Sequence, residues 1–306
     1  MFACTNGTST QTKYAMPITL PPLQLVEISG AEAIAFAQAQ FSSDVGTLEV
    51  GNWQWSAWLT AQGRVRAFFH LLRIREDTLW LVLRGGDAQR LRDALVRYVL
   101  RAKVILRVVE GMQAFAVHAD AADTPQAAAA GGIMLSGDGR VCLSLPGTLS
   151  RWLLLAPAAH LLTADDSDQA RNAAVLADID TGLVTLDPVL AEQLLPQWLG
   201  LDVLGAISVR KGCYPGQEVV ARLHFKGGVK RALYRIDFCA AALPFAGTAI
   251  LSGAGDESGV IVNAAWREPE VATALAVVHD AAPALDTLLV DSNRIDALAR
   301  AIPDSA

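Results

Sequence analysis

One segment of the chain brings a thiol together with two cations and a glycine turn. It reads Arg210-Lys211-Gly212-Cys213-Tyr214-Pro215-Gly216-Gln217-Glu218. A cysteine reacts as its thiolate, which neighbouring cations and a helix amino terminus both favour. If the apolar run at 219–223 is helical, Cys213 lies just ahead of such a terminus. On these residues alone, a cysteine packed in a structural turn is the first interpretation and a reactive thiol is the second.

Basic residues follow this segment and allow three interpretations. Positions 210–235 hold seven basic residues against one acidic residue. Arg222 and Lys226 could bind the carboxylates of a small ligand, contact RNA phosphates or belong to a solvated face. Proteins that bind single strands add stacking aromatic side chains to a basic groove, and few aromatic residues lie close by in the sequence. RNA binding is therefore the third of these interpretations.

The composition is that of a folded chain. Of 306 residues, 52% are hydrophobic and 18% are charged, and no window reaches the roughly 18 consecutive apolar residues of a spanning helix. The first residues lack the basic and apolar regions of a secretory signal, so a cytoplasmic location without a membrane partner is predicted. The four cysteines lie far apart, with no histidine at ligand spacing, which argues against a metal site or a disulfide framework.

The charge is unevenly distributed. The net charge is −6, yet positions 64–107 hold eleven basic residues against four acidic ones, in addition to the basic excess at 210–235. Two basic stretches in an acidic chain indicate a localised anionic partner.

Periodicity predicts the elements that position these residues. Strands are expected at 53–59, 65–75 and 78–84, where aromatic and branched residues are separated by turn-like residues. Helices are expected at 87–101 and 166–179, where apolar residues recur on one face. Helices inserted among paired strands indicate an α+β layer.

The same residue patterns divide the chain into four predicted regions. Residues 1–16 are polar and unpatterned and are expected to form a flexible tail. Residues 17–120 form a first α+β lobe, and residues 121–231 form a second one that carries the cysteine segment. At 232–306, short strands with glycine turns are typical of a small β-barrel.

Several motifs together resemble one family. The octapeptide 211–218, followed by Val220-Ala221-Arg222, resembles the signature of the YgfZ family, folate-binding proteins related to the T-protein (aminomethyltransferase) of the glycine cleavage system. Two upstream stretches agree with it: Gln38-Ala39-Gln40-Phe41-Ser42-Ser43-Asp44-Val45 and Gln62-Gly63-Arg64-Val65. The resemblance spans about residues 17–235. It implies a T-protein-like α+β fold, with two lobes of antiparallel sheets and helices plus a C-terminal β-barrel, around a central hole the size of tetrahydrofolate.

The resemblance implies roles for particular residues. Asp180 matches a glutamate that grips the pterin ring in folate-binding relatives, and a carboxylate can accept two hydrogen bonds from that ring. From the residues alone, a solvated aspartate near a helix end is the alternative. Leu23 and Ala174 stand at two positions that are aromatic and line this pocket in some relatives. The other expected folate-binding residues are Lys211, Tyr214, Gln217, Glu218, Arg222 and Lys226.

One feature of true T-proteins is missing. Their G-G-I-x-D-D stretch supplies an aspartate that acts on the folate, whereas the matching run at 63–69 holds no carboxylate. An arginine or a phenylalanine cannot serve as a general base there. Aminomethyl transfer by the T-protein mechanism is therefore not expected.

The expected function follows from this comparison. The resemblance implies a tetrahydrofolate-binding accessory protein that supports iron–sulfur cluster enzymes, including tRNA-modifying ones, and has no metal ligands of its own. Cys213 would supply the thiol chemistry. The alternative is a folate-dependent one-carbon transferase that uses Cys213 or Glu218 in place of the missing aspartate, and an RNA-binding module is a third option.

Overall fold

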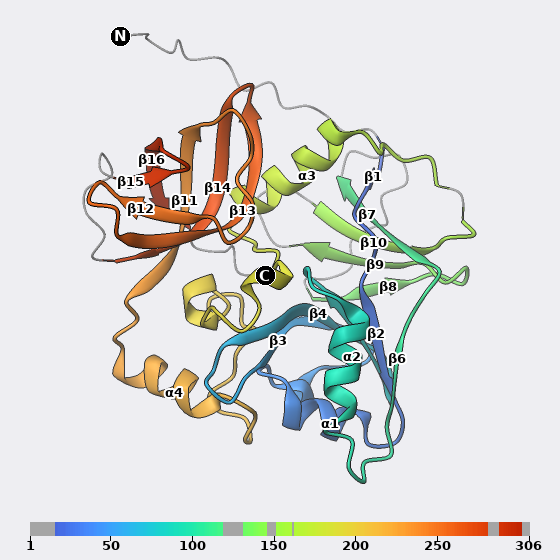
Figure 1. Cartoon of the computed structure of the whole chain (residues 1–306). Helices are drawn as coiled ribbons and strands as arrows, with labels where there is room; N and C mark the ends of the chain where they lie inside the picture. Colours follow the sequence, from blue (N-terminus) through green and yellow to red (C-terminus); the bar gives the residue numbers. More distant parts are fainter. Residues whose placement is uncertain (1–15, 119–130, 146–150, 161, 281–287, 302–306) are drawn as a thin grey trace.

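The chain forms two antiparallel sheets with helices and a closed barrel (Figure 1). The computed structural model describes residues 16–118, 131–145, 151–160, 162–280 and 288–301. The predicted α+β class and the C-terminal barrel are confirmed. The tail predicted at 1–16 lies almost entirely outside the described residues.

The first sheet has five strands in the order β3-β4-β5-β2-β6. These are β3 (Trp53–Leu59), β4 (Val65–Arg75), β5 (Thr78–Leu83), β2 (Leu25–Ser29) and β6 (Ile105–Val108). Side chains alternate between its two faces. Phe69 and Leu71 face helices α1 (Ala33–Gln40) and α2 (Ala88–Val96), whereas Phe68 and Leu72 face the centre of the molecule. Both faces of the sheet are therefore buried.

The second sheet has the order β1-β7-β10-β9-β8. Its strands are β1 (Ile18–Thr19), β7 (Met112–His118), β10 (Arg151–Pro157), β9 (Val141–Leu145) and β8 (Ile133–Leu135). Helix α3 (Asp168–Asp180) lies between this sheet and the barrel (Figure 1). Strand β7 pairs with β10, and β1 joins the same sheet through β7. This sheet therefore combines strands from both sides of residue 120, where the first lobe was predicted to end.

The barrel closes in the order β11-β14-β13-β12-β15-β16. Its strands are β11 (Arg231–Cys239), β14 (Val271–His279), β13 (Glu257–Glu268), β12 (Ala249–Ser252), β15 (Leu288–Val290) and β16 (Asn293–Arg300). Because the barrel is closed, none of its six described strands has an open sheet edge. Its core is built of small and branched residues such as Ala274, Ala276 and Val278.

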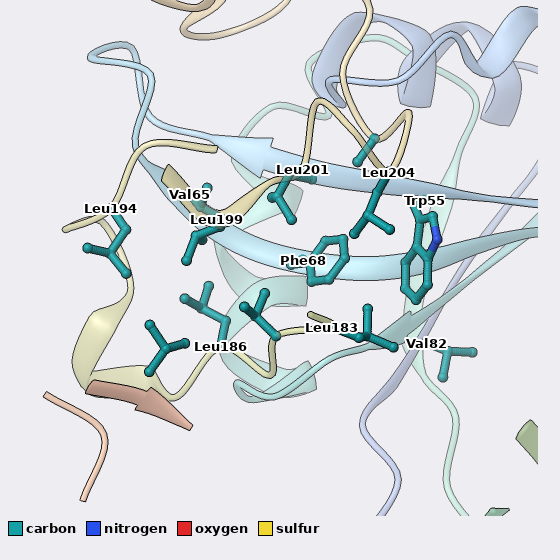
Figure 2. Packing of buried hydrophobic residues seen from close by; sticks show 14 of the residues in the cluster. Trp55, Val65, Phe68, Val82, Leu183, Leu186, Leu194, Leu199, Leu201 and Leu204 are labelled. Carbon is teal, nitrogen blue, oxygen red and sulfur yellow. The ribbon is translucent and has the colours of Figure 1, made fainter. Parts of the chain in front are cut away.

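The segment between α3 and the barrel fills the centre of the molecule. Leu183, Leu186, Leu199 and Leu201 pack against the inner face of the first sheet around Phe68 (Figure 2). Short 3-10 helices, Val45–Thr47, Pro188–Leu190 and Pro196–Leu199, and helix α4 (Gln217–Lys226) complete the fold. This shared core holds the two sheets and the barrel in one arrangement.

Helix α2 is shorter than the sequence predicted. The helix predicted at 87–101 ends at Val96, and the Tyr98 ring instead packs edge-on against Trp58, with 5.8 Å between ring centroids. None of the helices in the described part of the chain has the length and apolar character that a membrane-spanning helix needs.

Candidate functional site

A cavity of about 590 Å³ lies where the two sheets, α3 and the barrel meet. Its wall is mainly apolar, and a small number of polar side chains converge on it. Such a composition is typical of small-molecule sites. The polar lining residues are Gln24, His70, Arg84, His118, Arg151, Arg171, Asp178, Thr185 and Asn263.

Asp178 is the one carboxylate among the described lining residues, and two arginines hold it. Its Oδ2 accepts a hydrogen bond from Arg84 Nη2 at 2.7 Å, and its Oδ1 accepts one from Arg151 Nη1 at 2.7 Å. The side chains are 19%, 12% and 6% exposed, in the order Asp178, Arg84 and Arg151. Charges that are this buried persist because they are paired and hydrogen-bonded. We call this cluster the cavity triad.

Three chain segments that are distant in sequence position the triad. Asp178 comes from the last turn of α3, whose amino terminus is capped by Ser167 Oγ accepting from Ala170 N at 3.2 Å. Arg151 opens β10, next to β7. Arg84 follows β5, and its main-chain oxygen accepts a hydrogen bond from Leu186 N at 2.8 Å.

A glycine allows this last contact. Gly85 has a φ of +83°, and a Cβ atom at that position would collide with the main chain of Leu186. Only a residue without a side chain adopts this conformation at such a close approach without strain. Gly85 therefore allows the turn at 84–86 to pack directly against the main chain of Leu186. In this position the Arg84 side chain reaches Asp178.

The barrel contributes a paired amide to the cavity. Asn263 Oδ1 accepts from Thr185 N, and Asn263 Nδ2 donates to Thr185 O, both at 2.8 Å. This arrangement satisfies both main-chain groups of Thr185 with one side chain. Both residues line the cavity, so the barrel forms part of its wall.

His70 also borders the cavity and is fully buried. Its ring lies 4.1 Å from the Trp55 ring, centroid to centroid. Burial, reinforced by the positive charge of Arg84, lowers the pKa of His70 well below its usual value, and the Val82 main chain opposes this effect. The imidazole is therefore neutral at pH 7 and adds no positive charge to the wall.

One face of α3 runs along the cavity. Arg171, Ala174, Val175 and Asp178 all line it, and their spacing of three and four residues places them on the same side of a helix. Leu23 also lines the cavity. The resemblance to folate-binding relatives implied that Leu23 and Ala174 stand at pocket positions, and both residues do line this cavity.

Asp180 does not line the cavity. Its Oδ1 pairs with Arg267 Nη2 at 2.5 Å and with Arg235 Nη1 at 3.4 Å, both on barrel strands. Two residues along an α-helix correspond to a rotation of about 200°, so Asp178 and Asp180 face opposite ways. The folate-binding role expected for Asp180 is therefore not supported by its position, and Asp178 is the carboxylate that faces the cavity.

Three residues of the octapeptide have structural contacts instead of lining the cavity. Lys211 is buried, and its Nζ donates to Phe41 O at 2.6 Å and to Ser43 O at 2.8 Å. Burial lowers the pKa of Lys211 to about 8, although nearby Asp44 opposes the shift. Tyr214 is buried in the central core, which raises its pKa to about 12. Gln217 Nε2 donates to Lys211 O at 3.1 Å.

The other four predicted site residues lie on the outside of the molecule. Cys213, Glu218, Arg222 and Lys226 are all exposed, and none lines the cavity. The last three lie on α4, which projects from the rest of the molecule (Figure 1). The motif and the cavity are thus two separate places, whereas the sequence led us to expect one.

Sequence reasoning missed Arg84, Arg151 and Arg171 altogether. Each lies in a stretch without a recognisable motif, and Arg84 is one of eleven basic residues at positions 64–107. Asp178 stood two residues from the expected carboxylate. The buried residues Ala170, Ala174 and Ile179 mark the side of α3 that turns inward. Their spacing is the one sequence signal that bears on whether Asp178 or Asp180 faces the interior.

Among the described residues, no group of three or more histidine, cysteine, aspartate or glutamate side chains could hold a metal ion. None of the cysteines in the described part of the chain forms a disulfide: Cys142 is buried, and Cys213 and Cys239 are exposed. Burial raises the pKa of the Cys142 thiol to about 12. Cys142 is therefore an inert packing residue at neutral pH.

Comparisons with known proteins identify the fold. No protein-family model matches the sequence. Among solved structures, the chain is similar to the glycine cleavage system aminomethyltransferase T from Bartonella henselae, with a TM-score of 0.71 and 15% sequence identity. The similarity covers 94% of this chain and 85% of that chain. At this identity the similarity shows a common fold, and the T-protein-like architecture expected from the sequence is confirmed.

Proposed function

We propose that the protein binds a tetrahydrofolate derivative in the central cavity and serves as an accessory factor for iron–sulfur cluster enzymes, including tRNA-modifying ones. The observation that carries the folate proposal is the cavity triad in a mainly apolar cavity of about 590 Å³. The volume lies within the range of roughly 300–1,000 Å³ typical of small-molecule sites. The iron–sulfur part rests on the resemblance of the 211–218 segment to the YgfZ signature.

The chemistry of the lining fits a reduced pterin. One edge of the pterin ring presents an amino group and a ring N–H as donors next to a carbonyl acceptor. Asp178 offers carboxylate oxygens, which have further lone pairs beyond those used by the arginines. Arg84 and Arg151 offer N–H donors for the carbonyl. Apolar neighbours such as Leu23 and Val82 can pack against the ring faces.

The triad suits anchoring better than proton transfer. Both oxygens of Asp178 already accept hydrogen bonds from guanidinium groups at 2.7 Å. A general base must instead be free to take a proton from the reacting group. Cys213 is exposed and is not one of the lining residues, so a partner protein could reach its thiol from outside the cavity. These placements favour an accessory factor over an enzyme.

A folate-dependent one-carbon transferase is the second candidate. The similarity in fold to an aminomethyltransferase favours it. In this case the reacting group would be supplied by a substrate or a partner at the mouth of the cavity. Incubation with labelled methylene-tetrahydrofolate and candidate amine acceptors separates the two: sustained turnover supports the transferase, and binding without turnover supports the accessory factor.

The folate proposal is tested by calorimetric titration with tetrahydrofolate under anaerobic conditions. We expect saturable binding at one site per chain. Val175→Trp places a bulky side chain on the cavity wall at a partly exposed position, so it should weaken binding at least tenfold without unfolding the protein. Asp180→Asn, outside the cavity, is the matched control and should bind as the wild type does. Absence of binding by the wild type would refute the proposal.

The accessory role is tested separately in a strain that lacks the protein. Cys213→Ala should fail to restore the activity of an iron–sulfur tRNA-modifying enzyme, while its folate affinity stays at the wild-type value because Cys213 lies outside the cavity. Full restoration of activity by Cys213→Ala would remove the thiol from the proposal.

A further inference from the structure

We propose that Arg171 binds a carboxylate in the tail of the cavity ligand, so that the site selects a pteridine that carries a glutamate tail over one without it. This inference rests on the proposed function and extends it to the second end of the ligand. Three observations lead to it: the charge of the lining, the commitments of its arginines and the position of Arg171 on α3.

The charge of the described lining favours an anion. The lining holds three guanidinium groups, from Arg84, Arg151 and Arg171, and one carboxylate, that of Asp178. A cavity with an excess of one sign of charge concentrates field lines and attracts ligands of the opposite sign. A pteridine ring alone is neutral near pH 7. The excess positive charge therefore indicates a ligand with an acidic group beyond the ring.

The arginines differ in how far they are committed to protein partners. Arg84 and Arg151 are nearly buried and hold Asp178 between them. Arg171 is 40% exposed, and its ion pair is with Asp168, whose side chain is fully exposed, at 2.8 Å. Surface pairs of this kind contribute little free energy, so a ligand carboxylate can replace Asp168 at small cost. A guanidinium group can then bind that carboxylate through two parallel hydrogen bonds.

The position of Arg171 matches the second end of an elongated ligand. It lies seven residues before Asp178 on the same face of α3, which corresponds to a rise of about 10 Å. Its partial exposure places it toward solvent, whereas the triad lies deeper in the molecule. A ring anchored at Asp178 and extended by a spacer along α3 would bring its acidic tail to Arg171.

This assignment differs from the one made from sequence. The sequence offered Arg222 and Lys226 as residues that could bind the carboxylates of a ligand, but both lie on α4 and neither lines the cavity. Arg171 is the cavity cation that remains available once the triad is formed. Arg171, which would bind the tail carboxylate, therefore lies on α3, the helix that also supplies Asp178.

The experiment compares two ligands by anaerobic calorimetric titration: tetrahydrofolate, and 6-methyltetrahydropterin, which has the ring but no tail. We expect Arg171→Leu to raise the Kd for tetrahydrofolate about tenfold, as loss of one charge-assisted pair implies, and to leave the Kd for 6-methyltetrahydropterin unchanged. Asp168→Asn removes the competing carboxylate and should leave tetrahydrofolate binding equal or tighter. Arg171→Lys should restore part of the preference, because the charge remains.

The outcomes separate this inference from the proposed function. If the wild type binds neither ligand, the proposed function fails and the inference fails with it. If the wild type binds tetrahydrofolate and Arg171→Leu keeps the full preference over 6-methyltetrahydropterin, the inference alone is overturned. Loss of the preference in Arg222→Leu instead of Arg171→Leu would also overturn it, since the tail would then lie at α4.

Discussion

The ammonium group of Lys211 lies 2.6 Å from the main-chain oxygen of Phe41, a residue 170 positions earlier in the chain. A second hydrogen bond, of 2.8 Å, joins the same Nζ atom to Ser43 O. These contacts connect the octapeptide to the stretch that follows α1. The motifs at 38–45 and 211–218 are therefore in contact. This contact stabilises the fold and does not form part of the cavity wall.

Replacement of Lys211 should destabilise the protein. Lys211→Met leaves two buried carbonyl groups without their donor, and each unsatisfied buried group costs about 1–3 kcal/mol. We expect the free energy of unfolding in urea to fall by about 2–4 kcal/mol. Lys226→Met, at an exposed position of α4, is the control and should change it by less than about 0.5 kcal/mol. Equal stabilities of the two variants would contradict a structural role for Lys211.

The same lysine should make stability depend on pH. Burial lowers the pKa of folded Lys211 to about 8 from an unfolded value of 10.5. Between these values the unfolded chain holds a proton that the folded chain has released, so the contribution of Lys211 to the free energy of unfolding rises with pH. The difference in stability between the wild type and Lys211→Met should therefore widen from pH 8 to pH 10. Urea unfolding of both proteins at several pH values measures it, and a constant or narrowing difference would rule out the shifted pKa.

Gly216 should tolerate no side chain. Its φ is +80°, and a Cβ atom there would lie 2.5 Å from Thr60 O and 2.7 Å from Gly63 Cα. Gly216→Ala combines a left-handed conformation, which costs about 1–2 kcal/mol, with a collision against the main chain of the β3–β4 turn. We expect a loss of at least about 2 kcal/mol in the free energy of unfolding. Gly212→Ala is the control within the same motif, because nothing lies within 4 Å of its Cβ position. Thermal unfolding of both variants compares them, and a Gly216→Ala protein as stable as Gly212→Ala would show that the turn can move.

Local sequence patterns predicted the elements better than they predicted the site. The aromatic and branched residues of Trp53–Leu59 and Val65–Arg75, set between turn-like residues, identified two strands whose bounds the structure confirms. Pattern alone could not show that β7 would join a sheet with strands beyond residue 130, because strand pairing depends on contacts between distant segments. The end of α2 at Val96 was missed for a similar reason, since Tyr98 packs against Trp58 from a different part of the chain.

The site illustrates the limit of motif reasoning more sharply. A motif fixes residue types along the chain, but a helix turns about 100° per residue, so the choice between Asp178 and Asp180 depends on the phase of α3. The octapeptide was expected to bind folate because it resembles the YgfZ signature. In the structure Lys211 and Tyr214 hold the chain together, and the cavity cations come from three unremarkable stretches.

The contrast between the two aspartates of α3 gives the most direct test of this geometry. Asp178→Asn removes the charge that faces two nearly buried guanidinium groups, and breaking a buried pair by removing one partner costs about 3–5 kcal/mol. Asp180→Asn removes a charge from a cluster whose side chains are a third or more exposed, where the loss is at most about 1 kcal/mol. Urea unfolding of the two variants at pH 7 measures both values.

Salt adds an independent check on the same pair of variants. Screening acts on exposed charges much more than on buried ones. The small deficit of Asp180→Asn should therefore vanish in 1 M NaCl, whereas the deficit of Asp178→Asn should persist. If the two aspartates proved equally costly, or if salt removed both effects, the cavity triad would be a solvated ion pair, and the anchor assigned to the folate ring would be lost with it.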